Sequence, residues 1–147
     1  MKNARLLRAE DAYWRESNQM RVLNTDLAKQ LEATTLGGRL WRLRPGQAST
    51  KHRHELEQEL YVLLEGQGRI RVDEEALELA PLDALLVEPG AVRQVFNDTD
   101  GEALWLVVSA PPGPANTLEM SEAELRRLYP EGPRVLPPEL GGGEFSP

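Results

Sequence analysis

The chain has 147 residues, 40% of them hydrophobic and 28% charged, so we expect one globular domain with a single core. Its formal net charge of -7 argues against nucleic acid or an anionic membrane as a partner, since both bind basic surfaces. The absence of cysteine excludes disulfides and sulfur-ligated metals. No apolar run approaches the roughly 18 residues of a membrane span, and the N-terminus does not resemble a signal peptide, which together predict a cytoplasmic protein.

The first 19 residues are polar and charged, apart from the aromatic pair Tyr13 and Trp14. We expect either an arm that packs on the barrel or on a second subunit, or a loosely ordered leader held by its two aromatic side chains. The sequence leaves these alternatives open.

Residues 20–110 differ in character, because short aliphatic and β-branched segments alternate with turn residues. Pairs such as Pro45-Gly46 and Pro89-Gly90 supply the backbone angles of tight turns. Many short strands separated by such turns predict an all-β barrel or sandwich. The expected strands cover residues 21–24, 39–44, 59–64, 69–72, 77–80, 84–87, 92–96 and 104–109.

The strand pattern ends after Ala110, and residues 111–147 are expected to be a C-terminal extension. A short helix is predicted over residues 122–128, with Ser121 as its N-cap and Glu124 as the capping-box partner. The remaining tail, rich in proline and glycine, has little to bury and is expected to be largely unstructured and flexible.

The only two histidines of the sequence lie two positions apart, as His52-Arg53-His54. On a strand, alternate side chains share a face, so both imidazoles would point the same way. Glu59 follows after a short turn and could bring a carboxylate to the same place. Two histidines and one carboxylate can hold Fe(II), Mn, Ni or Zn, although a solvated histidine pair at a turn would give the same pattern.

Two glycines flank this group at fixed distances, Gly46 before it and Gly66 after it. With His52, His54 and Glu59, they resemble the first motif of the cupin superfamily, Gly-x5-His-x-His-x(3 or 4)-Glu-x6-Gly, and every defined position is filled. The resemblance implies a double-stranded β-helix (jelly-roll) barrel that binds a divalent metal through the two histidines and the glutamate. It also implies a homodimer formed through outer strands and N-terminal arms.

The second cupin motif, Gly-Asp-x4-Pro-x-Gly-x2-His-x3-Asn, is matched only in part, by residues 82–97. Leu82 replaces its first glycine, and the proline is displaced by one position to Pro89. Arg93 stands where the family normally has histidine as fourth metal ligand. The positions that agree are Asp83, Gly90 and Asn97.

Arg93 cannot be a metal ligand, because a guanidinium stays protonated and offers no lone pair. One interpretation is that it binds the carboxylate or phosphate of a substrate, beside a metal that His52, His54 and Glu59 hold. In a second, Arg93 pairs with Glu59 in a pocket that holds no metal. In a third, a one-residue register shift turns Arg93 outward and brings Gln94 nearer the pocket.

The expected function is therefore that of a metal-binding cupin of undetermined activity. One class it leaves open is a metal-dependent enzyme acting on a small anionic molecule, with Arg93 as a substrate-binding residue. Tyr61 shares the face of Glu59 and is a second candidate for substrate binding, with core packing as its other role. Two further classes stay open: a metal-free module that binds a sugar or organic acid, and a scaffold whose pocket has lost its role. A family resemblance does not choose among these, because this fold supports many chemistries.

Overall fold

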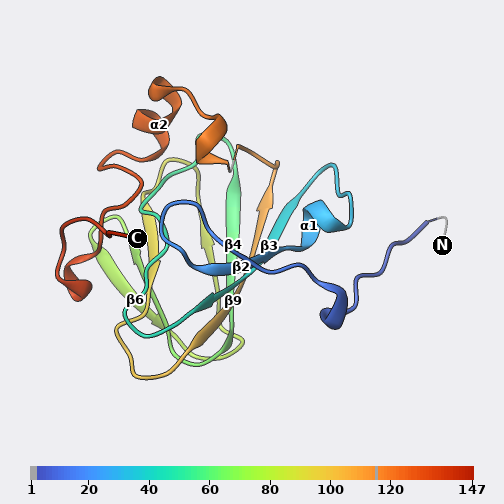
Figure 1. The fold of residues 1–147 in the computed structure, drawn as a ribbon, viewed down its shortest axis with the longest axis horizontal. Helices are drawn as coiled ribbons and strands as arrows, with labels where there is room; N and C mark the ends of the chain where they lie inside the picture. The colour runs from blue at the N-terminus through green and yellow to red at the C-terminus, as the bar shows by residue number, and fades with distance from the viewer. Residues whose placement is uncertain (1–2, 115) are drawn as a thin grey trace.

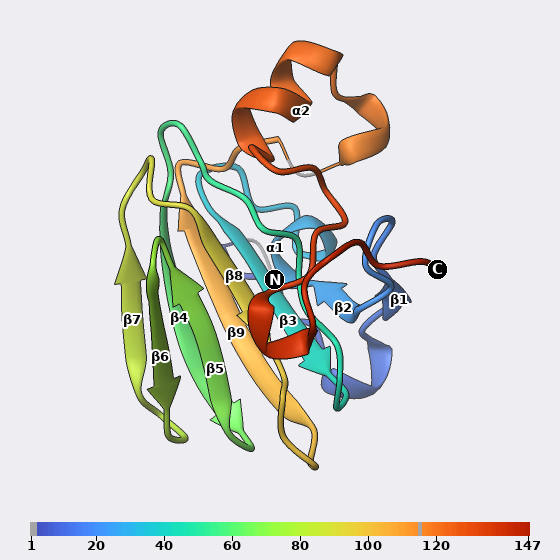
Figure 2. The ribbon, with the colours of Figure 1, turned by 90° about the vertical axis from the view of Figure 1, so that its left-hand side faces the viewer.

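The structure is a computed structural model that describes residues 3–114 and 116–147. Two antiparallel sheets face each other and enclose one core, as in a jelly roll (Figures 1 and 2). The larger sheet has the order β1 (Arg15–Glu16), β2 (Leu23–Asp26), β3 (Gly37–Leu43), β9 (Ala103–Ala110), β4 (Gln58–Glu65) and β7 (Ala84–Val87). The smaller sheet has the order β6 (Glu75–Leu79), β5 (Gly68–Val72) and β8 (Arg93–Phe96). The predicted all-β class is confirmed, and each predicted strand overlaps an observed one.

Strand β4 shows how the alternation of side chains builds the core. Glu59, Tyr61 and Leu63 are buried and face inward, whereas Leu60 and Val62 lie on the outer face. This is the alternation that the sequence predicts. The largest buried side chains around them include Trp105, Phe96, Leu43, Ile70 and Val22.

The segment that carries the histidines is less regular than predicted. It runs beside β8 of the smaller sheet and forms isolated bridges with it, at Ala48–Phe96 and His52–Arg93. The backbone N–H of His52 donates to the carbonyl of Arg93 at 2.9 Å, and the reverse bond is 2.8 Å. His52 and Arg93, far apart in the sequence, are therefore fixed side by side.

The predicted helix is present as α2 (Glu122–Leu128), and Ser121 and Glu124 form both bonds of the capping box. It lies over one end of the barrel (Figure 2). A one-turn helix, α1 (Leu27–Gln30), was not predicted. Three 3₁₀ turns cover Ala9–Asp11, Thr117–Glu119 and Pro138–Leu140. Within the described part of the chain, no helix has the length and apolar character to cross a membrane.

The tail after α2 corrects the expectation that it has too little to bury. Leu136, Leu140 and Phe145 pack against the core, and a bridge joins Val135 to Glu144. Arg71 of β5 also binds the Glu139 carboxylate through Nε at 2.7 Å. A few apolar residues spaced along a turn-rich segment are enough to dock it. The boundaries of arm, barrel and extension remain predictions.

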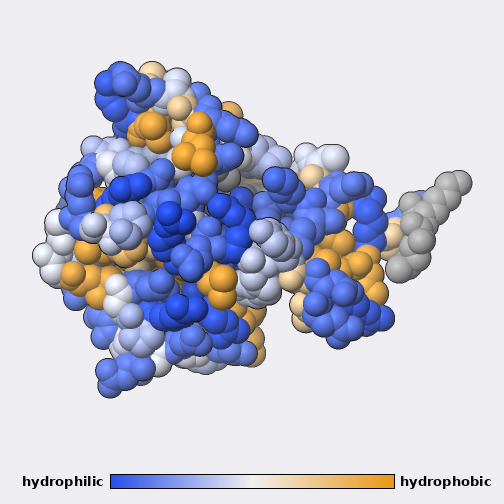
Figure 3. Space-filling model, in the orientation of Figure 1, coloured by the Kyte–Doolittle hydropathy of each residue, from blue (hydrophilic) through white to orange (hydrophobic). Residues whose placement is uncertain are grey.

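The N-terminal arm extends from the body of the protein, yet it is tied to its own subunit (Figure 1). Strand β1 pairs with β2, and Arg5 Nε donates to the carbonyl of Leu31 at 2.6 Å. Tyr13 is 69% exposed, whereas Trp14 is only partly exposed. The face of the protein drawn in Figure 3 is mainly hydrophilic, with scattered hydrophobic patches.

Candidate metal centre

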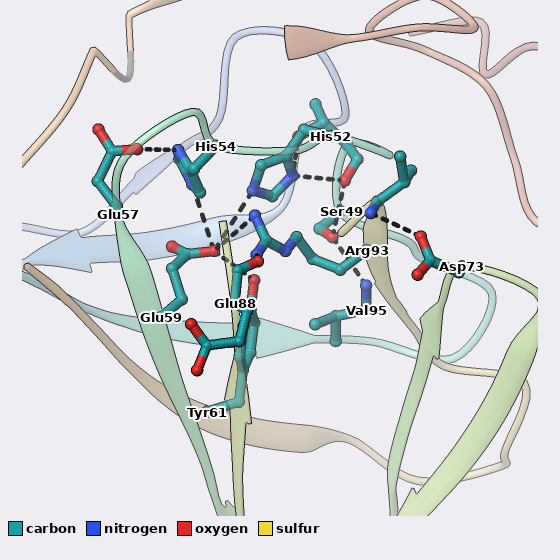
Figure 4. A network of polar contacts seen from close by, with 12 residues as sticks. Ser49, His52, His54, Glu57, Glu59, Tyr61, Asp73, Glu88, Arg93 and Val95 are labelled. Atoms are coloured by element: carbon teal, nitrogen blue, oxygen red, sulfur yellow. Dashed lines mark hydrogen bonds and ion pairs between the residues drawn. The ribbon is translucent and has the colours of Figure 1, made fainter. Parts of the chain in front are cut away.

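Three potential ligand atoms converge at one end of the barrel interior. The Nε2 atoms of His52 and His54 lie 3.6 and 3.3 Å from Glu59 Oε1, and one ligand atom from each residue falls within 4.8 Å of the others. The two imidazole rings are edge to face, with centroids 4.9 Å apart. Figure 4 shows both rings directed toward the Glu59 carboxylate. The structure thus brings together the three residues that the sequence predicts as metal ligands.

The remaining ring nitrogens face away from this point, toward acceptors. His52 Nδ1 lies 3.0 Å from the backbone carbonyl of Thr50, and His54 Nδ1 lies 3.2 Å from Glu57 Oε2. An acceptor at Nδ1 favours the tautomer that carries its proton there and leaves a lone pair on Nε2. Both histidines are therefore arranged to offer Nε2 to a cation.

Glu59 is 8% exposed and is surrounded by groups that favour its ionised form. Burial alone would raise its pKa, but the hydrogen bonds and charges of His52 and His54 outweigh burial and hold the pKa well below its usual value. The hydroxyl of Tyr61 donates to Glu59 Oε1 at 2.7 Å. Burial, reinforced by the negative charge of Glu59, raises the pKa of Tyr61 well above its usual value, so its hydroxyl keeps its proton.

Tyr61 and Arg93, the two predicted substrate-binding residues, both reach Glu59. The Tyr61 hydroxyl donates its hydrogen bond to that carboxylate, so its contact in the structure is with a candidate metal ligand; a role in binding substrate remains a prediction. Arg93 is 1% exposed, and its Nη1 lies 3.7 Å from Glu59 Oε1. Its Nη2 donates to the carbonyl of Glu88 at 3.1 Å. Among the described residues, Nε and Nη1 of Arg93 have no hydrogen-bond partner.

The outward orientation considered for Arg93 is wrong. Its guanidinium points into the site, and the amide of Gln94 instead donates to the carbonyls of Ser49 and Val135, under the C-terminal tail. Successive side chains of β8 therefore alternate without a register shift, despite the displaced Pro89. The other two interpretations of Arg93 both remain compatible with its position.

The C-terminal extension covers the site, which the sequence analysis did not predict. The ring of Tyr129, which follows α2, lies 6.2 Å from that of His52. Burial and the charge of Glu59 raise the pKa of Tyr129 to about 12. The carbonyl of Leu128 accepts a bond from the backbone N–H of Arg53, which ties α2 to the histidine segment.

Glu57 is the other residue that sequence reasoning missed. It lies in the short turn between His54 and Glu59, yet it is only 6% exposed, and its carboxylate approaches His54. A carboxylate so close to two histidines in sequence was the available signal. Its burial, however, depends on the extension, because Gly113 lies directly against the Glu57 carboxylate.

The candidate ligands lie within the part of the chain that matches a known family: the model of the Cupin domain matches residues 39–109. Structures named as cupins share the fold. The chain belongs to the cupin superfamily. A comparison with curated proteins finds none that matches this cupin.

Three solved structures illustrate the range of similar proteins. A sugar phosphate isomerase of the cupin superfamily from Silicibacter pomeroyi is 22% identical, with a TM-score of 0.67, and the match covers 74% of this chain and 76% of that one. A predicted oxalate decarboxylase from Thermotoga maritima is 20% identical, with a TM-score of 0.64 and coverage of 74% and 100%. The protein TT1209 from Thermus thermophilus is 32% identical, with a TM-score of 0.52 and coverage of 75% and 92%.

Proposed function

We propose that this cupin binds a divalent metal through His52, His54 and Glu59 and acts on a small anionic molecule that Arg93 orients. The observation that carries the proposal is the convergence of three ligand atoms, with Nδ1 of each histidine turned toward an acceptor on the far side. The close approach of two imidazole nitrogens to one carboxylate oxygen is favoured by positive charge among them, which a bound divalent cation would supply. The residues present therefore fit a metal.

The donor set narrows the choice of metal. Two imidazoles and one carboxylate suit Fe, Mn, Ni or Zn, and they leave coordination positions free. When bound, such a metal would supply Lewis-acid or redox chemistry. The chain's own contribution is to hold Glu59 ionised, through the two histidines and the Tyr61 hydroxyl, and to keep its carboxylate in place.

The burial of Arg93, and its nitrogens that are unpaired within the described part of the chain, support an anionic substrate. A buried guanidinium with two nitrogens that lack partners among the described residues retains capacity to bind a carboxylate or phosphate. Two of the proteins with the same fold are named for an isomerase of sugar phosphates and a decarboxylase of oxalate, which are anions. Their identities of 22% and 20% support the fold alone, so the reaction is proposed only as metal-assisted chemistry on a small acid.

A metal-free binding module is the second candidate function. It is favoured by the 3.7 Å distance between Arg93 Nη1 and Glu59 Oε1, which places the arginine charge where a metal charge would otherwise balance the carboxylate. In that case the barrel would bind a sugar or organic acid without chemistry.

The deciding experiment is the metal content of protein purified without a histidine tag, measured by plasma mass spectrometry beside the His52→Ala/His54→Ala double variant. A tag would add imidazoles to a chain that has only two. The proposal expects about one equivalent of Fe, Mn, Ni or Zn in the wild type and its loss in the variant. If the wild type stays metal-free after reconstitution, the metal proposal fails and the binding module takes its place.

We further propose that this cupin is a cytoplasmic homodimer. The outer face of the larger sheet is the proposed contact surface for the second copy. Leu60 and Leu86 are direct cross-strand neighbours on this face, and they are 38% and 52% exposed. Val108 of β9 lies opposite Leu60 on its other side. A contiguous apolar sheet face of this kind is typical of an interface between copies.

A further inference from the structure

The carboxylate of Glu57 has no part in the candidate ligand set, yet Glu57 is slightly more buried than Glu59. The two side chains are 6% and 8% exposed. Burying a charged carboxylate is costly unless it is paired, so a carboxylate at this depth calls for a partner. In the structure that partner is His54, whose Nδ1 lies 3.2 Å from Glu57 Oε2 (Figure 4).

In this contact, the Glu57 carboxylate faces the His54 nitrogen that is not directed at the proposed metal. His54 turns Nε2 toward Glu59 and Nδ1 toward Glu57, so its ring lies between the two carboxylates. The Nδ1 contact is close but not yet aligned as a hydrogen bond, and Nδ1 has no other partner among the described residues. Such contacts commonly tighten when the ring binds its ligand at the opposite nitrogen.

His52 provides an internal comparison. Its Nδ1 faces the backbone carbonyl of Thr50, an acceptor that no side-chain substitution can remove. For His54, the acceptor that faces Nδ1 is a side chain, the carboxylate of Glu57. The two histidines are therefore held by different means. His52 Nδ1 contacts the carbonyl and the hydroxyl of Thr50, at 3.0 and 3.3 Å, whereas His54 Nδ1 faces the Glu57 carboxylate.

The C-terminal extension completes the arrangement. Gly113 lies so close to the Glu57 carboxylate that a methyl group at this position would overlap it. Glycine at position 113 thus lets the extension cover Glu57 and shield it from water. This shielding strengthens the interaction between Glu57 and His54.

We infer that Glu57 is a positioning residue that fixes the His54 ring with its proton on Nδ1 and its Nε2 lone pair directed at the metal. The inference rests on the proposed metal function, since the metal is what His54 would bind. Glu57 itself acts through His54 and does not coordinate.

The test compares Zn²⁺ affinity, measured by competition with a chromophoric chelator, in the wild type and in Glu57→Met, Glu57→Gln and Glu55→Ala. Methionine fills similar space without a strong acceptor, and an apolar side chain suits a buried position. Glutamine restores an acceptor for Nδ1. Glu55 is an exposed carboxylate on the same turn, paired with Arg127, and serves as the matched control.

The expected result is a loss of Zn²⁺ affinity of about 10- to 100-fold in Glu57→Met, a smaller loss in Glu57→Gln and no change in Glu55→Ala. Affinity in Glu57→Met within twofold of wild type would overturn the inference. So would equal losses in the Met and Gln variants, because an acceptor at this position would then have no effect.

A second readout separates this inference from the metal proposal. The chain has only two histidines, so ¹⁵N spectra of the metal-free protein at mildly alkaline pH report each ring, with His52→Ala assigning the signals. We expect His54 to carry its proton on Nδ1 in the wild type and to lose that preference in Glu57→Met. If the wild type binds no Zn²⁺, the metal proposal fails, and the spectra still decide whether Glu57 sets the His54 tautomer; unchanged spectra would overturn it.

Discussion

Arg93 lies directly opposite His52, and each donates its backbone N–H to the carbonyl of the other, at 2.8 and 2.9 Å. This bridge places a permanent positive charge at the position where the second cupin motif has a histidine. The charge lies 3.7 Å from the oxygen of Glu59 that both histidines face. The centre is therefore predicted to bind its metal less tightly than the three ligands alone would, in exchange for a site that attracts anions.

Replacing Arg93 with methionine should separate these two effects. Removal of the charge should strengthen Zn²⁺ binding on the order of tenfold, since about 1.4 kcal/mol of repulsion is enough for that change. We expect oxalate or phosphate to raise the Tm of the wild type, and the same variant should lose that rise. Zn²⁺ titration and thermal melting measure both effects.

Arg69→Met is the control for this prediction. Arg69 carries the same charge on the neighbouring strand, but it pairs with Asp98 outside the site. Arg69→Met should change neither the Zn²⁺ affinity nor the rise in Tm with oxalate or phosphate. Weaker Zn²⁺ binding in Arg93→Met would show that the arginine supports the centre and does not oppose it.

Leu82 stores backbone strain that a glycine would release. Its φ is +74°, in the left-handed region that side chains other than glycine rarely adopt, and the residue is 78% exposed. Leu82→Gly should therefore raise the free energy of unfolding by about 0.5–1 kcal/mol, net of the greater freedom of glycine in the unfolded chain. Thermal melting should show a Tm higher by about 1–4 °C.

Leu82→Ala is the matched control, because it removes the same exposed side chain but keeps the Cβ that causes the strain. Its stability should stay close to that of the wild type. Equal stability of the Gly and Ala variants would contradict the strain account.

The ion pair between Arg71 and Glu139 should make docking of the tail depend on pH. The hydrogen bond from Arg71 lowers the pKa of Glu139, so folding favours its ionised form. Stabilisation by a lowered carboxyl pKa is present above the unfolded value, about 4.3, and is lost as pH falls through the folded value. Because the pair is partly exposed, it should contribute only about 0.5–1 kcal/mol.

Unfolding in urea at pH 7 and at pH 3 tests this prediction in the wild type and in Glu139→Gln. The variant should be less stable at pH 7, and the difference should vanish at pH 3. Glu144→Gln, an exposed carboxylate of the same tail, should match the wild type at both pH values. A difference that persists at pH 3 would rule out the ion pair as its cause.

The proposed homodimer predicts that Leu86→Glu produces a monomer, because it buries a charge in the apolar face shared with Leu60. Sedimentation velocity measures the mass. Leu118→Glu adds the same charge at a side chain that is 75% exposed on a 3₁₀ turn of the extension, and it should leave the dimer intact. A wild type that sediments as a monomer would refute the dimer, and a dimer that survives Leu86→Glu would place the interface elsewhere.

Local patterns accounted for most of the strands and for the ligand set. Alternation in β4 puts Glu59 and Tyr61 on the same face of the strand, opposite Leu60 and Val62. The capping box of α2 is also local, since Ser121 and Glu124 are one turn apart. By contrast, α1 was missed because a helix of one turn gives no periodic signal.

The sequence by itself predicted the all-β fold, the candidate ligands His52, His54 and Glu59, and the anomaly at Arg93, because the strand, turn and motif patterns behind them are local. Only the tertiary structure decided that Arg93 points at Glu59, that Gly113 and Tyr129 cover the site, and that Glu57 lies behind His54. Those positions depend on contacts between segments far apart in sequence. Burial and direction are set by such contacts, and no local pattern contains them.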